Sequence, residues 1–153
     1  MRLTHVAIAL ATLTAAPAFA AGDIAKGEAV FKTCQACHVI ADADGKVLGG
    51  MGKVGPNLHG LFGRQAGSLE GFNYGKDLEA LGETGLIWDE ALFVEYVQDP
   101  ANFLKTKLDK SNARSKMSFK LKGDEKVADV YAYLAQFSPP PTEAEAAAPA
   151  PTN

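Results

Sequence analysis

The chain has 153 residues, of which 47% are hydrophobic and 22% are charged. That composition is ordinary for a soluble globular protein, and the length gives room for one domain with a real core, while a second domain would be crowded. The formal net charge of −3 argues against nucleic acid as the main partner, because phosphate binding needs a basic surface.

Both ends of the chain are predicted to lie outside the folded domain. Residues 1–20 have the order of a signal peptide, with a positively charged start, a short apolar run and a small-x-small cleavage signal that ends at Ala20. The apolar run is too short to span a bilayer comfortably, so we expect cleavage near Ala20 and export; an uncleaved anchor is the alternative. Residues 138–153 are rich in Pro, Ala and Glu and predict a disordered tail.

Residues 21–137 form the expected domain, and its first part predicts helices. Asp23 is a suitable N-cap for a helix in which small or apolar residues recur at helical spacing, namely Ile24, Gly27, Val30 and Phe31. A shorter helix is expected over residues 76–81. No convincing strand pattern is present.

Two further helices are predicted in the second part of the domain. Asp89 can cap one of them, and this helix must end near Asp99 because Pro100 disfavours helical geometry in the residue before it. The last helix follows Gly123 and places on one face Val127, Val130, Tyr131 and Leu134.

Long connections separate these helices, over residues 39–75, which are rich in glycine, and over residues 101–122. Loops of this length are unusual in a compact domain and indicate either a function or something that they wrap. The sequence therefore predicts an all-α domain with three main helices and a short one, whose long loops enclose a non-protein group.

The chemistry of that group is indicated by Cys34, Cys37 and His38, which form the C-x-x-C-H pattern of c-type haem attachment. Two thiols three residues apart can add to the two vinyl groups on one edge of a porphyrin. The imidazole of His38 can then ligate the iron from one side. One covalent haem c, attached through Cys34 and Cys37, is the predicted cofactor.

Three other interpretations of the motif are weaker. A thioredoxin-like site needs a βαβ context, which is not visible. A zinc site needs four ligands, whereas the chain has two Cys and three His. A disulfide between cysteines three residues apart is possible in an exported protein, but it would be strained and would close a very short loop.

Beyond this motif, the chain resembles the class I cytochromes c. The resemblance begins at residues 55–64, Gly-Pro-Asn-Leu-His-Gly-Leu-Phe-Gly-Arg, and it continues through residues 71–74, Trp88, Tyr96, Pro100, residues 116–119 and residues 131–134. It thus covers residues 22–137 in order. Extra residues before the first stretch and before Met117 make the chain most similar to the larger cytochromes c2 of purple photosynthetic bacteria and their respiratory relatives.

The resemblance implies that Met117 is the second axial ligand of the iron, opposite His38. A soft thioether prefers reduced iron and so raises the reduction potential. Met51 lies outside the family's ligand position, and the resemblance places His59 on a surface turn, so neither is expected to bind iron.

The same resemblance implies roles for residues around the haem. The carbonyl of Pro56 would accept a hydrogen bond from His38 and fix its tautomer. The haem propionates would be hydrogen-bonded by three side chains, those of Arg64, Tyr74 and Trp88. Tyr96 would lie near the Met117 sulfur. The first and last helices would cross with close contacts between Gly27, Phe31, Val130 and Tyr133.

With both axial positions filled by protein, the resemblance implies an electron carrier and not an enzyme. The expected carrier is a periplasmic monomer that touches membrane complexes transiently, taking electrons from a cytochrome bc1-type complex and delivering them to a photosynthetic reaction centre or a terminal oxidase. Its docking face would be rich in lysine, comprising Lys105, Lys107, Lys110, Lys116, Lys120 and Lys122. A haem enzyme or gas sensor with an easily displaced Met117 is the rival hypothesis, and a membrane-tethered carrier is another.

Overall fold

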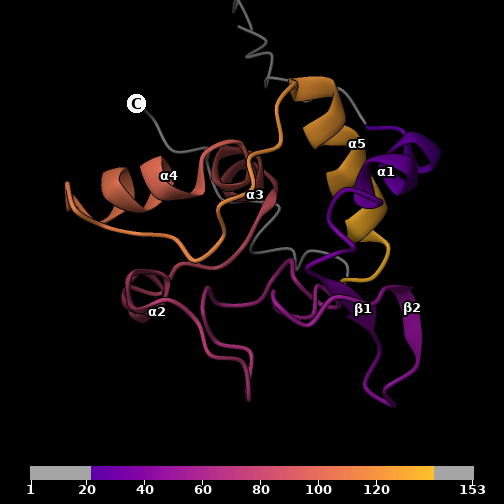
Figure 1. Cartoon of the computed structure of the whole chain (residues 1–153), viewed down its shortest axis with the longest axis horizontal. Coiled ribbons are helices and arrows are strands. Elements are labelled where there is room, and N and C mark those ends of the chain that lie inside the picture. The colour runs from indigo at the N-terminus through magenta and orange to yellow at the C-terminus, as the bar shows by residue number, and fades with distance from the viewer. Residues whose placement is uncertain (1–21, 140–153) are drawn as a thin grey trace, which may run out of the picture.

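The computed structural model describes residues 22–139; the predicted signal peptide and residues 140–153 of the predicted tail lie outside the described residues. Within this range the chain forms α1 (Ile24–Phe31), β1 (Val39–Ala41), β2 (Val47–Gly50), α2 (Lys76–Glu83), α3 (Glu90–Gln98), α4 (Pro100–Lys107) and α5 (Asp124–Ala135). In Figure 1, α3 and α4 lie on one side, α1 and α5 on the other, and α2 and the two strands below them. None of the helices in the described range has the length and apolar character needed to cross a membrane.

The first and last helices cross in close contact, as the family resemblance implied. The carboxylate of Asp23 accepts the N–H groups of Ala25 and Lys26 and so begins α1 as its N-cap. A Cβ atom on Gly27 would lie only 2.0 Å from the carbonyl oxygen of Asp129 in α5. The rings of Phe31 and Tyr133 pack beside this crossing with their centroids 5.4 Å apart.

The region after Pro100 differs from the expectation of a loop, because it forms the additional helix α4. Proline is well suited to the first position of a helix, where its missing N–H costs nothing and its fixed φ is already helical. The side chain of Asp99 accepts the N–H of Asn102 at 3.2 Å and caps this new helix. Asp99 and Pro100 therefore end α3 and begin α4.

A small antiparallel sheet is also present where no strand was expected. β1 and β2 pair Val39 with Gly50 and Ile40 with Gly49, and a β-bulge interrupts the register near Ala41. Strands of three and four residues are too short to show the alternation of apolar and polar residues by which a strand is recognised. The fold is thus mostly helical, with five helices and this hairpin among the described residues.

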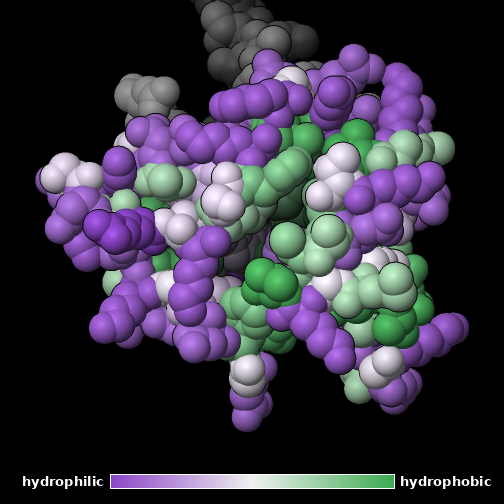
Figure 2. Space-filling view, in the orientation of Figure 1, coloured by the Kyte–Doolittle hydropathy of each residue, from purple (hydrophilic) through white to green (hydrophobic). Residues whose placement is uncertain are grey.

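Part of the hydrophobic core is built from Trp88, which precedes α3, and aromatic side chains of α3 and α4. Trp88 stacks on Phe103 with ring centroids 6.0 Å apart, and it meets Tyr96 edge to face at 5.1 Å. Phe103 and Leu104 of α4 are among the most deeply buried residues of the core. Figure 2, in the orientation of Figure 1, shows a hollow in the face turned to the viewer, bordered by hydrophobic residues and surrounded by hydrophilic ones.

Candidate haem-binding site

A cavity of about 260 Å³ lies at the centre of the described structure. A single water needs only about 10–15 Å³ of such space, so the side chains leave room for a much larger group. The cavity is lined by parts of six stretches that are distant in the sequence, within residues 33–38, 54–64, 72–78, 88–97, 114–121 and 130–134.

All nine residues predicted for the site contribute to this lining: Cys34, Cys37, His38, Pro56, Arg64, Tyr74, Trp88, Tyr96 and Met117. The two alternatives considered for iron ligation, Met51 and His59, are not among the lining residues. The side chain of Met51 instead points into solvent, with 86% of its surface exposed.

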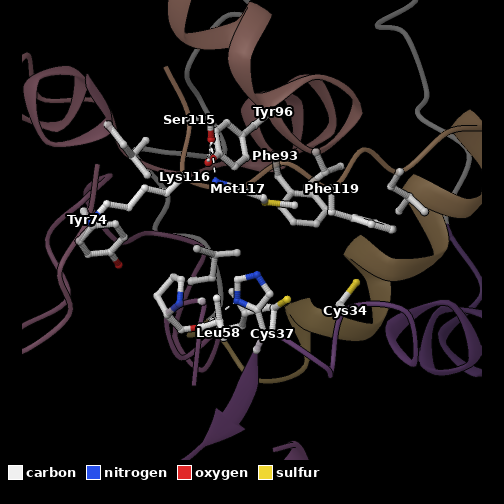
Figure 3. A pocket seen from close by; sticks show the side chains of 18 of the residues that line it. Cys34, Cys37, Leu58, Tyr74, Phe93, Tyr96, Ser115, Lys116, Met117 and Phe119 are labelled. Atoms are coloured by element: carbon white, nitrogen blue, oxygen red, sulfur yellow. Dashed lines mark hydrogen bonds between the residues drawn. The ribbon is translucent and has the colours of Figure 1, made fainter. Parts of the chain in front are cut away.

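Cys34 and Cys37 are positioned by the turns that follow α1. The N–H groups of Cys37 and His38 both donate to the carbonyl of Cys34, at 3.0 Å each. Both thiols are free, and their sulfur atoms lie on the same side of the cavity (Figure 3). Burial raises the pKa of the Cys34 thiol, so this thiol is protonated at neutral pH.

The imidazole of His38 is held in one tautomer. Its Nδ1 atom lies 2.9 Å from the carbonyl oxygen of Pro56. Because a carbonyl can only accept a hydrogen bond, Nδ1 must carry the proton, and Nε2 keeps its lone pair for a metal. Burial lowers the pKa of His38, while the Pro56 hydrogen bond acts in the opposite direction. The neutral ring is the form that ligates a metal.

Met117 approaches the cavity from the loop between α4 and α5, across from the two cysteines (Figure 3). Its N–H donates to Ser115 Oγ at 3.1 Å, and Ser115 Oγ is hydrogen-bonded to the Tyr96 hydroxyl at 3.3 Å. Tyr96 was expected near the Met117 sulfur. The Tyr96 hydroxyl is connected to the Met117 backbone through Ser115.

The three side chains predicted for the propionates border the same cavity. Arg64 donates to the carbonyls of His59 at 3.3 Å and Asn57 at 3.0 Å. Burial lowers the pKa of the Arg64 guanidinium and raises the pKa of the Tyr74 hydroxyl. The backbone N–H of Trp88 donates to the backbone carbonyl of Arg64, which ties these two residues together. Polar groups at the wall of an apolar cavity suit a ligand that carries buried carboxylates.

These donors fit a haem c. His38 and Met117 offer a nitrogen and a soft sulfur to one metal, and Cys34 and Cys37 offer two thiols for covalent attachment. No group of three or more His, Cys, Asp or Glu side chains suited to a metal ion occurs within residues 22–139, so the donor set does not resemble a zinc site.

Comparisons with known proteins agree with this chemistry. No family model matches the chain. Among curated proteins, cytochrome c-551 of Roseobacter denitrificans is 50% identical over 139 residues, covering 90% of this chain and 97% of the relative. Cytochrome c2 of Cereibacter sphaeroides is 45% identical over 131 residues, covering 84% and 90%. The chain belongs to the cytochrome c2 group of class I cytochromes c.

Solved structures confirm the class I fold of this cytochrome. The crystal structure of cytochrome c2 from Rhodobacter sphaeroides matches it with a TM-score of 0.75 and 44% identity, covering 78% of this chain and 99% of that chain. Ferric cytochrome c-550 from Paracoccus versutus matches with a TM-score of 0.73 and 46% identity, covering 77% and 99%. As a member of this group, the protein is an electron carrier with haem c and not an enzyme.

Sequence reasoning missed two residues that shape the site. Ser115 links Met117 to Tyr96, but a serine two residues before a methionine carries no recognisable signal. Gly55 lies against the His38 ring, where a Cβ atom would come within 2.3 Å of Cε1. Its place directly before Pro56 was visible in the sequence, and its contact with the ring was not.

Proposed function

We propose that this cytochrome carries single electrons through the periplasm as a monomer, from a cytochrome bc1-type complex to a photosynthetic reaction centre or a terminal oxidase. The observation that carries the proposal is a single cavity to which His38 and Met117 bring an imidazole and a thioether, beside the two free thiols of Cys34 and Cys37. When bound, the haem supplies a reversible one-electron couple.

In this proposal His38 and Met117 would hold the haem iron between them. The proton on Nδ1 of His38, held by Pro56, makes its Nε2 atom a stronger donor. The thioether of Met117 favours the reduced iron and raises the reduction potential. With two protein ligands in place, a substrate has no open coordination position, and little rearrangement accompanies a change of oxidation state.

The haem propionates are assigned to the side of the cavity that holds Arg64, Tyr74 and Trp88. A carboxylate in an apolar cavity is costly unless it is paired or hydrogen-bonded. Arg64 keeps a positive charge despite its burial, since its ordinary pKa is far above neutrality. Its two bonds to the carbonyls of Asn57 and His59 hold the guanidinium in place for that role.

Several lysines of the predicted docking face are already neutralised within the protein. Lys107 pairs with Glu95 at 2.8 Å, and the other two ion pairs, both 2.6 Å long, are Lys110–Asp77 and Lys120–Asp99. A paired lysine contributes less to the field that steers a partner, because the nearby carboxylate offsets the positive charge that a distant partner would experience.

The remaining basic residues supply the positive field in our proposal. Lys116 and Lys122 donate to neutral groups of Asn73 and Gln98 and so keep their full charge. Among the described residues, no ion pair involves Lys105. Arg114 and Lys116 line the cavity itself, as does the 42%-exposed Phe119. We therefore place the docking face at this rim, where an acidic partner would be attracted.

The periplasmic location rests on residues 1–20, whose order is that of a cleaved signal peptide. Cleavage near Ala20 would leave a chain that begins just before the N-cap Asp23. Sequencing the N-terminus of the protein purified from its host membrane and periplasmic fractions tests this point. A chain that still begins at Met1 and sediments with membranes would instead support a tethered carrier.

The test of the carrier function compares Met117→Ala with Met51→Ala in the haem-loaded protein. The oxidised wild type should show the sulfur-to-iron charge-transfer band and bind little carbon monoxide when reduced. Met117→Ala should lose the band and bind carbon monoxide readily. Met51→Ala should behave as the wild type, since Met51 lies at the surface. Ready binding of carbon monoxide by the wild type would favour a haem enzyme or gas sensor.

A further inference from the structure

The loop that carries Met117 spans residues 108–123 and has no helix or strand of its own. A loop of this length has many conformations in isolation, and one conformation dominates only where contacts with the rest of the fold select it. The contacts that hold the loop therefore decide where the Met117 sulfur lies.

The α2 side of the loop is held by Asp77, which uses both of its carboxylate oxygens. Oδ1 accepts the ammonium of Lys110 at 2.6 Å, and Oδ2 accepts the backbone N–H of Arg114 at 2.7 Å. The Asp77 side chain is only 14% exposed, while the Lys110 side chain is 50% exposed. The Asp77 side chain is thus more covered than that of its partner Lys110.

Neighbouring residues extend this contact towards Met117. The ammonium of Lys116 donates to the carbonyl and to the side-chain oxygen of Asn73, at 2.9 and 3.0 Å. A Cβ atom added to Gly75 would lie 3.4 Å from Lys116 Cγ, so the Gly75 backbone runs close to the Lys116 side chain. Residues 73–77 therefore hold the loop from Lys110 to the residue directly before Met117.

On its other side the loop is attached to α3. Ser115 is hydrogen-bonded to Tyr96, and the N–H of Leu121 donates to the carbonyl of Val97 at 2.9 Å. Beyond Met117, charged groups also hold the loop, because Lys122 donates to the carbonyl of Gln98 and Lys120 pairs with Asp99 at the end of α3. Before Met117, the α3 contact through Ser115 joins neutral groups, whereas Asp77 supplies a full charge to one side chain and one backbone N–H. Hydrogen bonds to charged groups are the stronger kind.

We infer that Asp77 is a positioning residue, which fixes the loop three residues before Met117 and so keeps the thioether in place as an axial ligand. The inference rests on the proposed role of Met117. It assigns α2, which contributes no ligand, the task of holding the ligand loop against the cavity. Loss of the Asp77 carboxylate should free the α2 side of the loop and make Met117 easier to displace.

The experiment measures the binding of imidazole to the oxidised, haem-loaded protein, because imidazole can bind only when Met117 leaves the iron. Asp77→Ala should bind imidazole about tenfold more tightly than the wild type, since it loses the bonds to a charged group. In urea, its charge-transfer band should also disappear well before the helical circular dichroism does.

A matched control is Glu125→Ala. Glu125, like Asp77, lies in the first turn of a helix and pairs with a lysine, Lys26 at 3.0 Å, but that pair joins α1 and α5. This variant should keep wild-type imidazole affinity. If Asp77→Ala fails to fold, Lys110→Met removes only the ion pair, keeps the bond to Arg114 and should show a smaller increase in the same direction.

The outcomes separate this inference from the proposed function. Wild-type imidazole affinity in both Asp77→Ala and Lys110→Met would overturn the inference, provided that Met117→Ala binds imidazole tightly. Loss of the band together with the circular dichroism in Asp77→Ala would also overturn it, because the role would then be merely structural. If Met117→Ala leaves both the band and the affinity unchanged, the ligand role of Met117 fails first.

Discussion

The Cβ position of Gly55 lies 2.3 Å from Cε1 of the His38 imidazole, 2.6 Å from Nδ1 and 2.8 Å from Nε2. Real Cβ atoms essentially never approach other atoms closer than 3.0 Å. The backbone of Gly55 therefore lies against the ring, and the carbonyl of the next residue, Pro56, accepts its Nδ1 proton. Gly55 thus leaves room for the His38 ring, and Pro56 fixes the orientation of the ring.

Gly55→Ala should force the His38 imidazole away from its present position. The added methyl group has no room, so the ring must tilt or the backbone must shift, and the bond to Pro56 weakens. We expect a changed reduction potential and a stability loss of about 1–3 kcal/mol, typical of overpacking. Potentiometric titration and urea unfolding of the haem-loaded protein measure both quantities. A variant with wild-type potential and stability would show that the ring does not depend on Gly55.

Gly27→Ala should destabilise the crossing of α1 and α5. The new Cβ atom would lie 2.0 Å from the carbonyl oxygen of Asp129, which cannot move without moving α5. We expect a loss of about 1–3 kcal/mol or more in urea unfolding. In a helix without this contact, replacing glycine by alanine would stabilise by roughly 0.5–1 kcal/mol, so a gain would contradict the prediction. Glu28→Ala, on the exposed face of the same helix, should stay within about 0.5 kcal/mol of the wild type.

Asp99→Asn should make stability less sensitive to acid. The ammonium of Lys120, and then the N–H of Asn102, lower the pKa of Asp99 below its ordinary value of 3.8. Because the folded pKa is the lower one, the ionised carboxylate stabilises the protein above pH 3.8, and this contribution is lost as the pH falls through the folded pKa.

Thermal unfolding midpoints, measured from neutral pH down to about pH 3, test this prediction. The midpoint of Asp99→Asn should fall less steeply at the acid end than that of the wild type. Asp89→Asn is the control, since Asp89 caps α3 just as Asp99 caps α4 but is in no ion pair among the described residues. Parallel acid profiles for the wild type and Asp99→Asn would exclude a contribution from the Asp99–Lys120 ion pair to acid sensitivity.

Lys105→Glu should slow association with an acidic partner more than the same change outside the predicted docking face. Lys105 is exposed, and no ion pair within residues 22–139 cancels its charge. We expect about a tenfold lower association rate with a bc1-type complex at low salt, and a smaller difference at high salt. Stopped-flow reduction of the haem-loaded protein measures both rates. Lys126→Glu, in the first turn of α5, makes the same change in net charge; equal slowing by the two variants would point to net charge alone.

The sequence predicted the helix caps well, because a cap depends on residues that are neighbours in the chain, whereas the crossing of α1 and α5 joins distant residues and was implied by the family resemblance. Asp23 and Asp89 cap α1 and α3 as expected, and Gly27 lies where α1 meets α5. The expectation of a loop after Pro100 was wrong. A proline that ends one helix is equally suited to begin the next, and the burial of Phe103 and Leu104 favours the second helix here.

The sequence alone determined the attachment chemistry, because two thiols and an imidazole within five consecutive residues are close in any conformation of the chain. It also located Met117, through the resemblance to a known family. Only the tertiary structure brought Met117, from the loop after α4, to the cavity that His38 lines, and only it revealed the ion pairs that cancel several lysines of the proposed docking face. These relationships join residues far apart in the chain, so they depend on how the loops pack and not on local sequence.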